Sequence, residues 1–79
     1  MISKHEAEEH GRQLAVRVMA QARTYGLGPE DVTVMVTEDI ERHTRAMEAE
    51  GRSAKEIREW TDTVRGACTL WGITEDVVA

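Results

Sequence analysis

Residues 26–37 read GLGPEDVTVMVT, and the interpretation of this stretch decides the fold class. The alternating β-branched residues between Val32 and Thr37 are typical of a strand. Helical spacing nevertheless places five residues on one face: Val32, Val36, Ile40, His43 and Met47. We expect a helix from Pro29 to about Glu50, capped by Gly51, because no other segment offers a strand partner and an unpaired strand leaves its backbone groups unsatisfied. A short strand followed by a helix that begins at Thr37 stays the alternative.

The residues before this stretch predict another helix. Ser3 followed by Glu6 is typical of a capping box, in which the two side chains satisfy backbone N–H groups at the start of a helix. Gly26 is expected to adopt the left-handed conformation that ends a helix, and Pro29 suits the first position of the next one. One apolar stripe runs along this first helix: Ala7, Gly11, Leu14, Val18, Ala22 and Tyr25.

The residues after Gly51 predict a third helix. Ser53 and Glu56 repeat the capping box, and Gly72 is expected to end the helix. For residues 73–79, a short final helical turn capped by Thr74 and a frayed end are both left open. The inner face of the third helix is expected to hold seven residues: Ile57, Trp60, Thr61, Val64, Ala67, Cys68 and Trp71.

Together these segments predict an all-α fold, an antiparallel three-helix bundle, because short connections place consecutive helices side by side. With no Phe in the chain, the two Trp residues are expected to supply much of the buried area. Three apolar residues, Val16, Val34 and Leu70, point away from the stripes of their helices. The expected large core residues are Leu14, Val18, Tyr25, Val32, Val36, Ile40, Met47, Ile57, Trp60, Val64 and Trp71.

The composition excludes several classes of function. The chain has 79 residues, with 15 acidic side chains against 10 basic ones and a formal net charge of −5. Phosphate binding needs clustered Lys and Arg, so this balance counts against direct binding of nucleic acid. No apolar run approaches the ~20 residues of a membrane span, and residues 1–10 lack the apolar core of a signal peptide. We expect one domain, residues 1–79, in a soluble protein of the cytoplasm that does not bind membranes.

The histidines and the cysteine give no catalytic or metal-binding motif. His5 and His10 are five residues apart, which separates them by about 140° around a helix instead of placing them on one face. They are expected to form exposed ion pairs with Glu9 and Glu6, and no metal site is predicted. His43 is expected to be a hydrogen-bonded core or interface residue, and Cys68 a buried, inert thiol. We therefore predict neither a cofactor nor an enzyme.

Residues 51–60, GRSAKEIREW, resemble the opening of a helix-turn-helix motif of the response-regulator type. That motif implies a second helix with a basic face that reads DNA. No such helix follows at the expected distance, and acidic residues interrupt the exposed face of this one. An ordinary capped amphipathic helix is the favoured interpretation.

Acidic residues line the outer face of the second predicted helix. Glu30, Glu41 and Glu48 lie within about 20° of one line opposite the apolar stripe, and Glu38 lies beside them. A row of carboxylates of this kind could compete with phosphates for a basic nucleic-acid channel. In the alternative interpretation the row is an ordinary solvated face, neutralised by three i, i+4 ion pairs. Those pairs are Glu38–Arg42, Glu41–Arg45 and Glu48–Arg52.

In its size, acidic balance and single-domain organisation, the chain resembles the small phage- and prophage-encoded anti-CRISPR proteins. The resemblance implies an inhibitor that docks on a CRISPR surveillance complex and blocks the binding of target DNA. The residues expected to bind the partner are Glu30, Val34, Glu38, Glu41, Glu48 and Leu70, with Val16 as a further apolar contact. The alternative is a homodimeric helical adaptor or small transcription-related regulator, with Val16, Val34 and Leu70 between the two copies.

Overall fold

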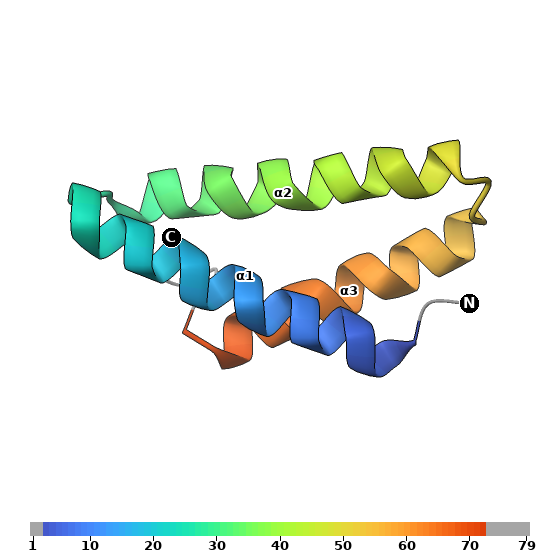
Figure 1. Cartoon of the computed structure of the whole chain (residues 1–79), viewed down its shortest axis with the longest axis horizontal. Coiled ribbons are helices and arrows are strands. Elements are labelled where there is room, and N and C mark those ends of the chain that lie inside the picture. Colours follow the sequence, from blue (N-terminus) through green and yellow to red (C-terminus); the bar gives the residue numbers. More distant parts are fainter. Residues whose placement is uncertain (1–2, 73–79) are drawn as a thin grey trace.

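The computed structural model describes residues 3–72, and these residues form three helices (Figure 1). The helices are α1 (Lys4–Tyr25), α2 (Pro29–Ala49) and α3 (Ala54–Leu70). Residues 31–37 are helical, so the strand alternative is wrong and the antiparallel three-helix bundle is confirmed. None of the described helices combines the length and the apolar character needed to cross a membrane. The final turn considered for Thr74 falls outside the described residues.

The caps predicted from the sequence set the helix ends. The Ser3 hydroxyl accepts a hydrogen bond from the Glu6 N–H at 3.1 Å, and Gly26 has the left-handed φ of 65° that ends α1. At α3 the capping box is complete, because Ser53 Oγ accepts from the Glu56 N–H at 3.1 Å and the Glu56 carboxylate accepts from the Ser53 N–H at 3.4 Å. Local sequence therefore fixes where α1 and α3 begin.

The closest packing in the molecule is between α1 and α3, where the two backbones nearly touch at Gly11. A Cβ atom at Gly11 would lie 2.5 Å from the Ala67 Cβ and 2.7 Å from the Val64 carbonyl oxygen. The Cys68 thiol donates a hydrogen bond to the Gly11 carbonyl at 3.4 Å, and burial raises the pKa of this thiol. Small residues therefore set the distance at which the two helices cross.

The core around this crossing contains most of the expected residues. Trp60 is the large aromatic residue of this core, with 8% of its surface exposed. Val32 and Ile57 are partly buried and pack against the core. The core cluster comprises Ala7, Leu14, Ala15, Val18, Val36, Ile40, Met47, Trp60, Val64 and Cys68.

Two residues expected in the core, Tyr25 and Trp71, are instead 72% and 54% exposed. Figure 1 shows α3 ending beside the middle of α1, so, of the other two described helices, only α2 reaches the last turn of α1, which carries Tyr25. Trp71 is the C-cap of α3, and its ring lies against the Arg12 guanidinium, 5.7 Å from the ring centroid. The prediction that both Trp residues fill the core was wrong: Trp60 is buried, whereas Trp71, at the end of α3, is half exposed.

We expect Gly11→Ala to lower the free energy of unfolding by about 1–3 kcal/mol, because the added methyl group overpacks the crossing of α1 and α3. Gly66→Ala is the matched control, since Gly66 lies within α3 with open space around it. That variant should raise the free energy of unfolding by up to about 1 kcal/mol, through the better helix propensity of Ala. Urea denaturation measures both variants, and a Gly11→Ala protein as stable as wild type would contradict the close crossing.

Candidate functional site

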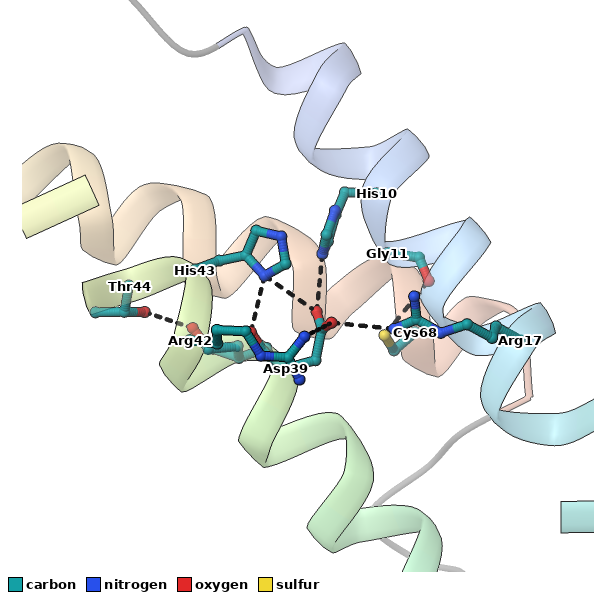
Figure 2. A network of polar contacts seen from close by, with 9 residues as sticks. His10, Gly11, Arg17, Asp39, Arg42, His43, Thr44 and Cys68 are labelled. Atoms are coloured by element: carbon teal, nitrogen blue, oxygen red, sulfur yellow. Dashed lines mark hydrogen bonds and ion pairs between the residues drawn. The ribbon is translucent and has the colours of Figure 1, made fainter. Parts of the chain in front are cut away.

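Among residues 3–72, Asp39 is the charged side chain that the fold buries, with 2% of its surface exposed. It lies in the middle of α2 and points toward α1 (Figure 2). It follows Val36 by three residues and precedes His43 by four, and this spacing places it at the edge of the inner stripe of α2. Burying a carboxylate costs free energy unless the charge is paired, so the groups around Asp39 must stabilise it.

The two oxygens of the Asp39 carboxylate face different partners. Oδ2 lies 3.0 Å from His10 Nε2 and 3.4 Å from His43 Nδ1. Oδ1 lies 3.0 Å from an Arg17 guanidinium nitrogen and 3.9 Å from one of Arg42. One oxygen is therefore shared by two imidazoles and the other faces two guanidinium groups, with α1 and α2 each supplying one group of each kind.

The two imidazoles pack against each other and against Trp60 of α3. The centroids of the His10 and His43 rings are 4.4 Å apart, and Trp60 lies 5.2 Å from His10 and 5.7 Å from His43, stacked on the latter. His43 Nδ1 is also 2.9 Å from the Asp39 main-chain carbonyl oxygen. Because that oxygen can only accept, Nδ1 carries a proton and donates it. All three helices thus contribute to one polar cluster.

These neighbours determine the pKa of Asp39. Burial raises this pKa, but the hydrogen bonds from His10 and Arg17 and the charges of His43 and His10 outweigh burial and hold the pKa below its ordinary value of 3.8. The carboxylate therefore stays ionised in the folded chain at neutral pH.

His10 and Asp39 were not found by sequence reasoning, which sought a metal site within one helix and paired His10 with Glu6. The structure pairs His10 with Asp39, 29 residues away on α2. His43 was expected to be hydrogen-bonded, and this is confirmed. The three residues His10, Asp39 and His43 could hold a metal ion, since one ligand atom from each lies within 4.8 Å of the other two. The spacing of Asp39 from His43 was the one signal in the sequence for this cluster.

The acidic residues predicted to bind a partner lie on the outside of α2. Glu30, Val34, Glu38, Glu41 and Glu48 are all exposed, Val34 to 53%. We call these five residues the acidic ridge. Arg45, four residues after Glu41, falls by its spacing on the same stripe of the helix.

The three neutralising ion pairs considered for this row do not form among the residues that the structure describes. Arg42 faces Asp39 instead of Glu38. Arg52 lies 3.6 Å from the Glu50 carboxylate and 3.5 Å from that of Glu56. The glutamates of the ridge therefore keep their charges without a partner in the described part of the chain.

Leu70, the sixth predicted partner residue, belongs to a different surface. It is 86% exposed and lines a groove together with Arg12 and Trp71. All the residues that line this groove come from α1, α3 and the C-cap of α3, whereas Val34 lies on α2. The structure therefore brings the acids and Val34 together but does not add Leu70 to them. Val16, the further apolar residue, is 52% exposed on α1.

Comparison of the chain with protein families, with characterised proteins and with solved structures found no match.

We expect Asp39→Asn to lower the free energy of unfolding by about 1–3 kcal/mol at neutral pH, because the amide removes a charge that His10 and Arg17 bond. The pKa of Asp39 is lower in the folded chain than in the unfolded chain, so this contribution is present above the unfolded pKa and is lost as the pH falls through the folded pKa. Urea denaturation at a series of pH values should show the two proteins converging in acid. Glu38→Gln, at an exposed neighbouring position, is the control and should change stability little. A constant difference between wild type and Asp39→Asn at all pH values would contradict a charge-based role.

Proposed function

We propose that the protein acts without catalysis, by docking the acidic ridge of α2 on a basic surface of another protein. The observation that carries the proposal is that the four glutamates of the ridge are exposed and have no ion-pair partner among the described residues. A row of carboxylates that form no ion pair in the described part of the chain gives the outer face of a helix a negative potential, which attracts a basic groove. Val34, which lies within the row, supplies apolar contact at the same surface.

A basic groove that normally holds nucleic acid is the partner whose chemistry fits this ridge. Carboxylates in a row repeat negative charge along a line, as phosphates do along a strand, and they compete for the same Lys and Arg side chains. A CRISPR surveillance complex is the target that the resemblance to anti-CRISPR proteins suggests, with the protein blocking the entry of target DNA. The mechanism is occlusion, and it requires only the outer face of α2.

We expect the double variant Glu41→Lys/Glu48→Lys to bind its partner about tenfold more weakly than wild type and with less dependence on salt, because two favourable charges become repulsive. The matched control is Glu59→Lys/Asp62→Lys, which changes the net charge equally at two exposed acids of α3. The partner is first captured from a lysate of the source organism with wild type as bait. Its affinity for each variant is then measured at several salt concentrations. Equal affinities for wild type and the α2 variant would remove the ridge from the mechanism.

If the captured partner is a CRISPR surveillance complex, the same proteins are tested as competitors of a labelled target duplex. Wild type and the α3 variant should displace the duplex, and the α2 variant should not. Capture of a partner that binds no nucleic acid would contradict occlusion of a nucleic-acid groove.

A homodimeric adaptor is the second candidate, favoured by the 86% exposure of Leu70 beside the half-exposed Trp71. Apolar side chains exposed together are typical of an interface with another protein. If two copies pair through this surface, light scattering should give a mass that depends on concentration for wild type and a monomer for Leu70→Glu. A wild-type monomer at all concentrations would contradict this candidate.

A further inference from the structure

Three side chains of the donor types that bind zinc meet between α1 and α2. His10 comes from α1, and Asp39 and His43 come from α2, with one ligand atom of each within 4.8 Å of the other two. Imidazole nitrogens and carboxylate oxygens are common ligands of Zn²⁺, and sites with three protein ligands leave a fourth position for water. The donor set therefore has the composition of an open zinc site.

The two distances around Asp39 Oδ2 are close to those between ligands of a tetrahedral ion. This oxygen lies 3.0 Å from His10 Nε2 and 3.4 Å from His43 Nδ1. In a tetrahedral zinc site with bonds of about 2.0–2.1 Å, neighbouring ligand atoms are separated by about 3.3–3.4 Å. Shifts of a few tenths of an ångström would bring these two contacts to the spacing of metal ligands, and the two imidazole nitrogens lie within 4.8 Å of each other.

The groups around the three ligands hold them in place for an ion. Arg17 bonds Asp39 through Oδ1 at 3.0 Å, which orients the carboxylate and leaves Oδ2 directed at the imidazoles (Figure 2). Trp60, which is buried, packs against both rings. Outer contacts of this kind orient ligands and contribute to the affinity of metal sites.

In the metal-free protein, hydrogen bonds join the atoms that an ion would bind. His10 Nε2 and His43 Nδ1 each donate to Asp39, and binding of an ion at these nitrogens leaves each neutral ring with its proton on the other nitrogen. The main-chain carbonyl of Asp39 lies within α2 and keeps its regular helical hydrogen bond when His43 Nδ1 turns to the ion. No buried polar group is therefore left without a partner by the exchange.

The nearby positive charges do not occupy the ion's position. Arg17 and Arg42 both face Oδ1, and their side chains are 59% and 67% exposed, so solvent screens them. Neither guanidinium group is paired with Oδ2, the oxygen shared by the imidazoles.

We propose that His10, Asp39 and His43 form a binding site for one divalent transition-metal ion of the zinc class, which links α1 to α2. The proposal does not rest on the acidic ridge, because the ligands lie between α1 and α2 and the ridge lies on the outer side of α2. An ion at this position adds a cross-link to α2, which makes fewer contacts with either of the other helices than they make with each other.

The test is titration of the purified, metal-free protein with Zn²⁺ by calorimetry and with Co²⁺ by visible absorption. One ion per chain should bind, and the Co²⁺ protein should show the strong visible bands of tetrahedral coordination. With free Zn²⁺ at 100 times its dissociation constant, the equilibrium constant for unfolding should fall about 100-fold. Failure of wild type to bind either ion saturably would overturn the proposal.

Single variants separate this site from adventitious binding. His10→Gln and His43→Gln should each weaken Zn²⁺ binding more than about 100-fold, since even outer contacts of metal sites are worth 10–100-fold. His5→Gln is the matched control, because His5 is exposed on α1 and lies outside the cluster, and the Zn²⁺ affinity of this variant should equal that of wild type.

Circular dichroism checks that each variant folds. If His10→Gln does not fold, His43→Gln, at a side chain 41% exposed, carries the comparison. Affinity retained in His43→Gln, or lost equally in His5→Gln, would show that the ion binds elsewhere.

Discussion

The close crossing of α1 and α3 at Gly11 is the constraint on which the rest of the arrangement depends. A helix pair can approach this closely only where side chains are absent or small, and Gly11 opposite Ala67 meets that condition. The crossing positions Val64 and Cys68 in the core and directs Trp60 toward α2. The two helices thus form a tightly packed pair, and α2 is added to that pair through fewer contacts.

Asp39 largely determines how α2 is positioned on this pair. The apolar stripe of α2 stabilises the bundle by burying apolar surface. This effect is not directional, so it would tolerate sliding or turning of α2 on its neighbours. The carboxylate tolerates neither, because a buried charge without partners is costly and its partners on α1, His10 and Arg17, lie at fixed positions. The cost of burying Asp39 is thus offset only in the observed register of α2 against α1.

The parts of this structure that depend on local sequence could be predicted, and those that depend on the meeting of distant segments could not. Ser3, Gly26 and Ser53 act on the backbone within a few residues, so the helix ends follow from the sequence. The exposure of Tyr25 depends on where α3 crosses α1, which helical periodicity does not contain. Likewise, periodicity places His10 and Asp39 on faces of their helices. It does not show that these two residues, 29 positions apart in the sequence, meet in the fold. The candidate metal cluster was missed for that reason, whereas the exposed row of acids, a property of one helix, was found.

The buried carboxylate also influences the charge of the outer surface. Arg42 is four residues after Glu38, a spacing that favours an ion pair on the surface of a helix, and three residues after Asp39. Its guanidinium faces Asp39, whose neighbourhood is less hydrated and whose attraction for a cation is correspondingly stronger. Glu38 is thereby left without the cation that would have neutralised it. The inner face of α2 thus affects its outer face: Asp39, which pairs with α1, also draws Arg42 away from Glu38.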